Sequence, residues 1–352
     1  MNKPFADKLR KIASYVPGEQ PQCAGRIKLN ANENPYPPSP RVAAALRDFD
    51  AATLAFYPDA NAHRLKNALA AQNGLKASQV FVGNGSDDVL ALAFQSFFCS
   101  DQPILYPDIT YSFYPVWCGL FRVPYETVPL GADFRVNPRA FDRRSGGVLL
   151  PNPNAPTGIG EPLALLEDIL RHNADCVVII DEAYVDFGAE SAVSLLPKYE
   201  NLLIVQTASK SRSLAGLRVG WAFGSETLIG TLEAVKNSYN SYTLDAVAIE
   251  AAAASVEDDA YFRKTCKQVM DTREASAEAL RALGFSILPS QANFLFATHP
   301  QKNAAELFEA LRAQNIFVRY FDLPRIDNYL RITVGTDAQM ARLTDALKTI
   351  LS

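Results

Sequence analysis

A lysine and an arginine follow two apolar runs in the middle of the chain. Leu202 to Val205 form an aliphatic, β-branched run typical of a buried strand, and Lys210 lies in the serine-rich turn that comes next. An amine in such a position can act as a nucleophile and form an imine with an aldehyde. Arg218 precedes the next apolar run, 219–223, where a guanidinium could bind a phosphate through two hydrogen bonds. Together they suggest an aldehyde that carries a phosphate, although each alone would be an ordinary surface cation.

A carboxylate ends another apolar segment. Residues 176–180 are almost entirely apolar, and Asp181 follows them directly. A charge at the end of a buried strand is costly unless a cation compensates it. The plainer interpretation is an aspartate that caps the next turn.

Residues 79–98 read as a strand, a glycine-rich turn and a helix. The backbone amides of Gly85, Ser86 and Asp87 would open the helix, and a helix N-terminus attracts anions such as phosphate. Glycine-rich turns before helices are common, however, and Ser86 or Asp87 could serve only as a cap. The segment has neither GxGxxG nor GxxxxGK[ST], so a dinucleotide-binding or P-loop protein is not supported.

The segment SKSRSLAGLRVG, residues 209–220, resembles the cofactor-lysine signature of fold type I pyridoxal-phosphate aminotransferases. Further segments are similar to those of one class II family of that fold type, the histidinol-phosphate aminotransferases, and stand in the same order. They are LNANENP, FYP, GNGSDD, TY, PNAPTG, DEAY and LRITVG, and they span the chain from about residue 27 to residue 335.

The resemblance implies pyridoxal 5′-phosphate as the cofactor, bound to Lys210 as an internal aldimine. Asp181 would keep the ring nitrogen protonated, and Tyr184 would reach the phenolic oxygen. Tyr111 occupies the position of the aromatic residue that stacks on the ring. The groups expected to hold the phosphate are Gly85, Ser86, Asp87, Ser209 and Arg218.

The chain departs from the family pattern at one position. The second asparagine of the family's PNNPTG contacts the phenolic oxygen, and this chain has Ala155 there. Asn154 is the adjacent side chain able to replace the missing amide, and a water molecule is the alternative.

Substrate and partner residues are also implied by the resemblance. Arg331 matches the arginine that binds the substrate anion, and Arg319 lies in a neighbouring predicted strand. Asn32 and Glu33 lie in LNANENP, near the family's active-site entrance. Tyr57 matches the tyrosine that the family contributes to the neighbouring subunit's cofactor phosphate, so we expect a homodimer.

The order of predicted elements indicates an α/β fold. A large domain with a mostly parallel sheet between helices, of the aspartate-aminotransferase-like type, is expected at 30–245. An N-terminal arm is expected at 1–29 and a smaller α+β domain at 246–352. The alanine-rich stretch 243–284 predicts a long helical connection between the domains.

Composition excludes several classes of protein. The 352 residues are 48% hydrophobic and 20% charged, as in a globular protein, and the net charge of −4 offers no basic surface for nucleic acid. The N-terminus lacks the apolar core of a signal peptide, and no stretch reaches the roughly 18 apolar residues of a membrane helix, so we expect a cytoplasmic protein. The five cysteines and three histidines lack ligand spacing, which argues against a metal site or a disulfide framework.

The function implied by the resemblance is a transamination in histidine biosynthesis. L-Histidinol phosphate and 2-oxoglutarate would be interconverted with imidazole-acetol phosphate and L-glutamate in a ping-pong reaction through Lys210. The alternatives are an aromatic or other amino-acid aminotransferase of the same fold, a pyridoxal-phosphate-dependent decarboxylase and a non-catalytic protein that binds the cofactor.

Overall fold

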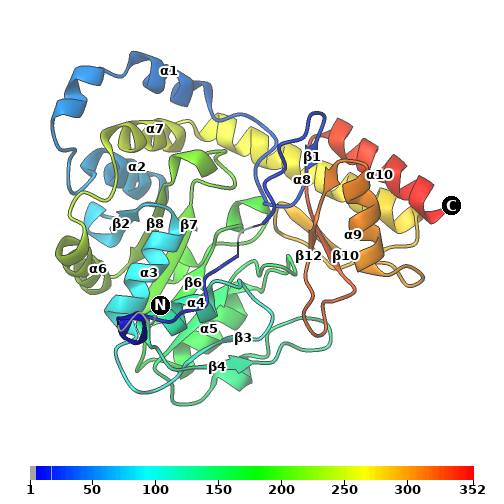
Figure 1. The fold of residues 1–352 in the computed structure, drawn as a ribbon. Coiled ribbons are helices and arrows are strands. Elements are labelled where there is room, and N and C mark those ends of the chain that lie inside the picture. The colour runs from blue at the N-terminus through cyan, green and yellow to red at the C-terminus, as the bar shows by residue number, and fades with distance from the viewer. Residues whose placement is uncertain (1–4, 17) are drawn as a thin grey trace.

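The computed structural model describes residues 5–16 and 18–352. A large lobe is built on a seven-stranded sheet and a small lobe on a four-stranded sheet (Figure 1). A two-stranded parallel sheet joins β1 (Ile27–Lys28) to β11 (Ile316–Phe317), so a segment near the N-terminus lies against the small lobe.

The large sheet has the order β2-β8-β7-β6-β5-β3-β4. Strand β8 runs antiparallel to β2 and β7, and the other neighbours are parallel, so the predicted mostly parallel sheet is confirmed. Parallel strands buried on both faces read as continuous apolar runs, which is why they stand out in the sequence. The strands are β2 (Val80–Gly83), β3 (Ile104–Pro107), β4 (Tyr125–Val128), β5 (Gly147–Pro151), β6 (Val178–Asp181), β7 (Leu202–Thr207) and β8 (Gly220–Gly224).

Helices cover both faces of this sheet. Successive residues of each strand point to opposite sides, so apolar side chains on both faces pack against helices. Ile179 and Leu203 share one core with α3, α4 and α6, whereas Ile180 and Ile204 share the other with α1, α2, α5 and α7. The bounds of these helices are α1 (Pro40–Asp48), α2 (His63–Asn73), α3 (Ser86–Phe97), α4 (Tyr114–Phe121), α5 (Leu163–His172), α6 (Glu226–Tyr239) and α7 (Ala246–Glu257).

The small lobe is the predicted α+β unit. Its antiparallel sheet has the order β12-β13-β10-β9. Helices α8, α9 and α10 supply the apolar side chains that pack on it. The elements are β9 (Ser286–Ile287), β10 (Phe294–Thr298), β12 (Arg319–Tyr320), β13 (Leu330–Thr333), α8 (Asp259–Ala282), α9 (Ala304–Ala313) and α10 (Asp337–Leu351).

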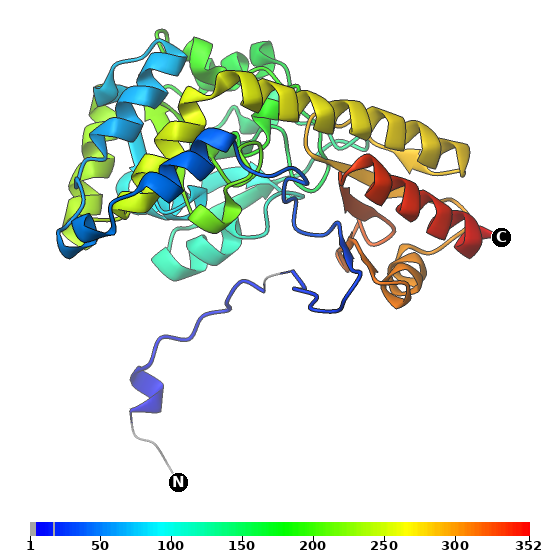
Figure 2. The same cartoon turned by 90° about the horizontal axis from the view of Figure 1, so that it is seen from above.

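The predicted connection 243–284 consists of two helices. Asp258 separates them and caps α8, since its side chain accepts a hydrogen bond from the Tyr261 amide. The alanines of α7 lie in the core that also contains residues of α1 and α2, so α7 packs as part of the large lobe. Helix α8 runs from the large lobe to the small lobe (Figure 2). We therefore propose that the lobes divide at Asp258 rather than at 245/246.

Short 3-10 turns complete the fold. They are η1 (Ala6–Lys8), η2 (Ala51–Ala55), η3 (Ala77–Gln79), η4 (Pro138–Phe141), η5 (Val185–Phe187), η6 (Ala192–Leu195) and η7 (Ala215–Leu217). The first lies near the start of the N-terminal arm, which projects from the large lobe in Figure 2 and contacts it where Arg10 Nη1 donates to the Leu120 carbonyl at 3.0 Å. Among the described residues, no helix has the length and apolar character needed to span a bilayer.

Gly220 allows β8 to approach the start of α3. A Cβ atom at this position would lie 2.3 Å from the backbone nitrogen of Ser86, and Gly220 is paired in register with Gly83. We expect Gly220→Ala to lower the free energy of unfolding by roughly 1–3 kcal/mol, because backbone atoms must move to admit the methyl group. Urea denaturation measures the change.

Gly216→Ala is the matched control, since a Cβ atom there would meet no other atom within 4 Å. Its effect should stay within about 0.5 kcal/mol. Equal losses in the two variants would contradict the close approach as the cause.

Candidate active site

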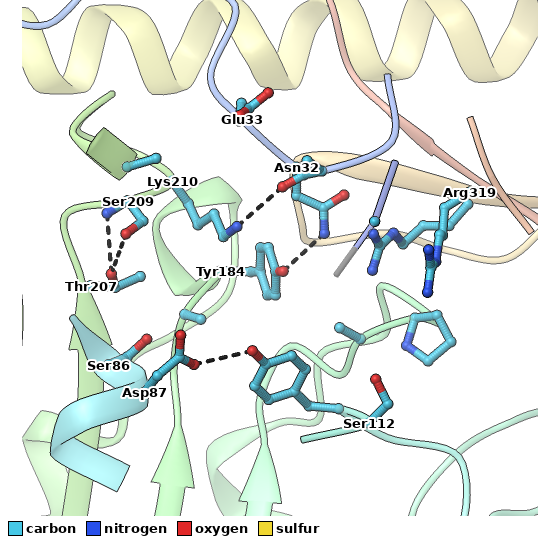
Figure 3. A pocket seen from close by; sticks show the side chains of 18 of the residues that line it. Asn32, Glu33, Ser86, Asp87, Ser112, Tyr184, Thr207, Ser209, Lys210 and Arg319 are labelled. Carbon is cyan, nitrogen blue, oxygen red and sulfur yellow. Dashed lines mark hydrogen bonds between the residues drawn. The ribbon is translucent and has the colours of Figure 1, made fainter. Parts of the chain in front are cut away.

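A cleft of about 240 Å³ opens where several parallel strands of the large sheet end, next to the small lobe. Open α/β sheets bind ligands at the carboxyl ends of their strands. Figure 3 shows this cleft from close by. The predicted residues that line it are Asn32, Glu33, Ser86, Asp87, Tyr111, Tyr184, Ser209, Lys210, Arg218, Arg319 and Arg331.

Lys210 lies in the turn after β7 and points into the cleft beside Tyr184 (Figure 3). Its Nζ donates to the Ala31 carbonyl at 3.3 Å and lies 5.8 Å from the centre of the Tyr184 ring. The turn is held from outside by Asn34, whose Nδ2 donates to the carbonyl of Lys210 at 3.0 Å and of Ser211 at 3.2 Å. Sequence reasoning missed Asn34, although it lies in the same LNANENP segment as Asn32.

Arg218 lies at the opposite end of this turn, next to the start of α3. Its guanidinium makes long contacts, at 3.5 Å to Ser209 Oγ, at 3.5 Å to Asp87 Oδ2 and at 3.4 Å to the Ala215 carbonyl. Gly85 has a φ of 86°, and a Cβ atom there would lie 2.5 Å from Arg218 Nη2. Glycine is therefore needed both for the backbone conformation and for the space that the arginine occupies.

The amides at the start of α3 differ in availability. Ser86 and Asp87 open the helix, and the first amides of a helix have no acceptor within it. The Gly85 amide, in contrast, donates to the Gly83 carbonyl at 2.9 Å, and Gly85 does not line the cleft. The structure thus corrects the expectation that the Gly85 amide holds an anion: Gly85 supplies space, and the next two residues supply donors.

Tyr111 forms one wall of the cleft. Its hydroxyl donates to Asp87 Oδ1 at 3.1 Å, and its ring meets those of Tyr114 and Trp117 nearly edge to face. Burial, followed by the neighbouring Asp87 carboxylate, raises the pKa of Tyr111 well above its ordinary value. The ring is therefore a neutral, fixed surface against which a flat ligand can stack.

Asp181 lies at the end of β6, behind the residues that line the cleft. It is 5% exposed; its Oδ2 accepts from the Tyr114 hydroxyl at 2.8 Å, and its Oδ1 accepts from the Ala183 amide at 3.2 Å. Burial raises the pKa of this carboxyl to about 6, although both hydrogen bonds and the charge of Lys210 oppose the rise. Within residues 5–16 and 18–352 no cation lies within ion-pair distance of Asp181. A cationic ligand atom would stabilise it.

Asn154 does not line the cleft, which corrects the expectation that it replaces the amide missing at Ala155. Its Nδ2 donates to the Ile109 carbonyl at 2.9 Å and to Thr157 Oγ1 at 3.1 Å. Ala155 and Pro156 form the cleft wall instead. The sequence could not reveal this, since the direction of a side chain in a turn depends on the surrounding loops.

Two arginines from the small lobe lie at the other end of the cleft. Arg331 Nη2 donates to the Asn30 carbonyl at 3.0 Å, and its Nε is buried with no hydrogen-bond partner among the described residues. Burial lowers the pKa of Arg331, and the nearby Arg319 lowers it further. In the part of the chain that the structure describes, neither arginine forms an ion pair, so this end of the cleft can accept an anion.

Glu33 and Tyr57 are placed differently from the rest. Glu33 lies at the rim, where its carboxylate pairs with Lys28 at 2.7 Å. Tyr57 is 81% exposed, stacks on Tyr242 with ring centres 4.5 Å apart, and does not reach the cleft of its own chain.

Sequence reasoning missed several residues that line the cleft. Tyr15 comes from the N-terminal arm and stacks on Phe113 with ring centres 4.6 Å apart. Thr207 ends β7, and its Oγ1 accepts from the Ser209 amide at 3.1 Å. The position of Thr207 at a strand end was a usable signal, whereas nothing in the irregular arm pointed to Tyr15.

Comparisons with known proteins identify the family. The family Aminotransferase class I and II matches residues 24–347. The chain is 57% identical to histidinol-phosphate aminotransferase 2 of Dechloromonas aromatica over 354 aligned positions, which cover 99% of each chain.

Two solved structures share the fold. Histidinol-phosphate aminotransferase from Sinorhizobium meliloti, in complex with pyridoxal 5′-phosphate, has a TM-score of 0.83 at 24% identity, covering 92% of this chain and 90% of that chain. Aspartate aminotransferase from Thermus thermophilus with maleate has a TM-score of 0.78 at 19% identity, covering 92% and 91%. The predicted aspartate-aminotransferase-like fold is confirmed.

The match to the family covers most of the chain and includes every strand of the large sheet. Pyridoxal 5′-phosphate is the cofactor of this family, as in the Sinorhizobium structure. The chain therefore belongs to the class I and II aminotransferases, and within them to the histidinol-phosphate aminotransferases.

Proposed function

We propose that this enzyme transfers the amino group of L-histidinol phosphate to 2-oxoglutarate, giving imidazole-acetol phosphate and L-glutamate. The observation that carries the proposal is that Arg331 and Arg319 lie across the cleft from Lys210 and form no ion pair with any described residue. Both substrates present an anion to such a site. The relative from Dechloromonas, which carries this activity in its name, supports the choice of substrate.

The residues at the cleft fit both charged groups of pyridoxal 5′-phosphate, the phosphate and the protonated ring nitrogen. Arg218, Ser209 Oγ and the amides of Ser86 and Asp87 would hold the phosphate, and the guanidinium would exchange its long contacts for short charged ones. The buried carboxylate of Asp181 would stabilise a protonated ring nitrogen. When bound, the cofactor supplies an aldehyde for the amino group and an electron sink for the adjacent carbon.

Lys210 would perform the proton transfer. Its Nζ would take the proton from the substrate carbon that bears the amino group, as a general base positioned within the cleft. Asn34 fixes the backbone of the lysine turn through two hydrogen bonds, so the turn keeps its place while the lysine side chain moves. The Tyr184 hydroxyl and the Tyr111 ring would orient the reacting group from two sides.

Arg331 would bind both substrates in turn. Its Nη2 already donates to Asn30, and its unpaired Nε leaves a direction open for an oxyanion. A guanidinium matches phosphate and carboxylate oxygens equally well in geometry. The aromatic rings of Phe294 and Phe321 lie near the guanidinium, each with its centre 5.5 Å from Cζ.

We further propose that two copies of the chain form a homodimer in which each supplies Tyr57 to the other's phosphate site. Large exposed apolar residues support an interface in two places. Phe5, Leu9, Ile12 and Val16 lie on the arm, and Leu54, Phe56, Tyr57, Tyr239 and Tyr242 lie on the large lobe. Exposed apolar groups of this size on a soluble fold mark interaction sites.

The reaction is tested by following the visible absorbance of protein loaded with pyridoxal 5′-phosphate. L-Histidinol phosphate should remove the band, and 2-oxoglutarate should restore it. Lys210→Ala should show neither the band nor its cycling, because the amine that reacts with the aldehyde is gone. L-Phenylalanine, L-tyrosine and L-aspartate are the competing donors, and faster cycling with any of them would contradict the proposed substrate.

Asp181→Asn should stabilise the protein that has been freed of cofactor. The folded pKa of about 6 lies above the ordinary value of 3.8, so the folded carboxyl holds its proton more tightly than the unfolded one. Wild-type stability is therefore lost as pH rises from about 4 to about 6, whereas an amide has no proton to lose. At pH 8 the variant should be more stable by up to about 3 kcal/mol, and near pH 3 the difference should vanish.

Denaturation by urea at several pH values measures this difference. Binding of pyridoxal 5′-phosphate, in contrast, should weaken in the same variant, because a protonated ring nitrogen loses its carboxylate. Parallel pH profiles for the two proteins would contradict the buried, uncompensated carboxylate.

A shared site in the homodimer is tested by mixing two damaged chains. Lys210→Ala and Tyr57→Ala should each have low activity alone. In a hybrid dimer one of the two sites has both native residues, so co-refolded mixtures should recover about a quarter of wild-type activity. A mixture no more active than the average of its components would show that each chain uses its own Tyr57.

A further inference from the structure

The side chain of Asn32 lies between the two lobes and bonds to both. It is 1% exposed. Its Nδ2 donates to the Tyr184 hydroxyl oxygen at 2.9 Å, and its Oδ1 accepts from Thr333 Oγ1 at 3.0 Å. Figure 3 shows Asn32 directly above Tyr184, with Lys210 beside them. Asn32 therefore does not point its amide at a substrate, although it lines the cleft.

The partners of Thr333 indicate the direction of these hydrogen bonds. The Asn32 amide N–H donates to Thr333 Oγ1 at 3.0 Å, so the threonine oxygen acts as an acceptor there. Among the described residues, Asn32 Oδ1 is the acceptor for the threonine proton, and this orientation of the amide turns Nδ2 toward Tyr184. The tyrosine oxygen must accept this bond, and its own proton is left over.

That proton has no acceptor in the part of the chain that the structure describes. Across the described residues, the hydrogen bond from Asn32 is the one that Tyr184 Oη makes. Tyr184 lines the cleft, and its ring is held edge to face against Phe294, with centres 5.1 Å apart. With one side of the hydroxyl taken by Asn32, the O–H is left to donate into the cleft.

Asn32 itself is held in one orientation. Its φ is 55°, in the left-handed region that asparagine tolerates better than most residues. Its carbonyl accepts from Asn293 Nδ2 at 2.9 Å. The backbone of Asn32 is therefore bonded to Thr333 and Asn293 of the small lobe, and its side chain is bonded to Thr333 on one side and to Tyr184 on the other.

The hydrogen bond from Asn32 to Tyr184 matters because position 155 has an alanine, which cannot supply an amide near the tyrosine. Ala155 packs in one small apolar cluster with Ala292 and Phe294, against which Tyr184 also rests, and it offers no amide. Asn154 Nδ2 already donates to the Ile109 carbonyl and to Thr157 Oγ1. The amide that reaches Tyr184 comes instead from Asn32, on a different loop.

We propose that Asn32 is a positioning residue that aims the Tyr184 hydroxyl proton at the phenolic oxygen of the bound cofactor. The proposal rests on the proposed function, because that oxygen is the anionic acceptor in question. Asn32 also connects Tyr184 to the strand that carries Arg331, the residue proposed to bind the substrate. Arg331 and Thr333 are two residues apart on β13 and so share a face, where Arg331 contacts Asn30 and Thr333 contacts Asn32.

The test uses Asn32→Asp in protein loaded with pyridoxal 5′-phosphate. A carboxylate accepts from both neighbours, so the Tyr184 proton would turn away from the cleft. A hydrogen bond to the phenolic oxygen favours the unprotonated form of the lysine–cofactor chromophore. The pH midpoint of its visible absorbance should therefore rise by about one pH unit, as an order of magnitude for one charged hydrogen bond. Tyr184→Phe should raise it in the same direction.

The double variant Asn32→Asp with Tyr184→Phe separates the effect of the tyrosine proton's direction from the effect of the new carboxylate's charge. The new carboxylate also raises the midpoint through its charge alone, and that part remains when the tyrosine hydroxyl is absent. The shift caused by Asn32→Asp should therefore be clearly smaller in the Tyr184→Phe background than in the wild type. Equal shifts in the two backgrounds would overturn the proposal, as would an unchanged midpoint in Asn32→Asp.

Two further variants guard against a general loss of structure. Asn32→Ala removes the donor without adding charge, and should raise the midpoint by less than Asn32→Asp, with thermal unfolding recorded alongside. Asn30→Ala is the matched control, because the Asn30 amide donates to the Glu19 carbonyl at 2.8 Å and not to Tyr184. A midpoint shifted as much by Asn30→Ala would overturn the proposal. Absence of any visible band in the wild type would instead refute the proposed function.

Discussion

The site depends on charged groups that the fold buries without a counter-ion among the described residues. Asp181 lies at the end of a strand with its pKa raised by burial, and within the same residues Arg331 has a buried Nε with no hydrogen-bond partner. Burying such groups is unfavourable unless a ligand completes them. A molecule with a phosphate, a protonated ring nitrogen and a second anion matches the three charged positions at Arg218, Asp181 and Arg331. In the proposed function, affinity and specificity would therefore arise from the same electrostatic imbalance.

The strands of the two sheets hold the charged groups of the cleft at fixed positions. The large sheet, covered on both faces, fixes Asp181 and the lysine turn at adjacent strand ends. The small sheet fixes Arg331 in a strand paired on both sides. Segment 29–34 joins the two, since Leu29 packs in the small lobe while Asn32 and Asn34 bond to residues of the large lobe. A movement of one lobe relative to the other would therefore change the hydrogen bonds of Tyr184 and of the lysine turn.

The sequence predicted what depends on local pattern. The apolar runs at 176–180 and 202–205 marked the buried strands β6 and β7. Residues that end such strands were brought together because parallel strands end at one edge. The break between α7 and α8 was not predicted, since the alanine-rich stretch has helical character throughout and only Asp258, as a cap, interrupts it.

Side-chain direction in loops is what local pattern does not determine. Asn154 and Asn32 are both asparagines in irregular segments, yet one turns its amide to a carbonyl behind the cleft and the other to Tyr184. The difference is set by partners distant in sequence, Ile109 for the first and Thr333 for the second. A hydroxyl such as that of Thr333 carries one proton, and Asn32 Oδ1 is its acceptor among the described residues, so the amide of Asn32 turns toward Tyr184. The direction of side chains that line the cleft is therefore set partly by residues such as Thr333 that do not line it.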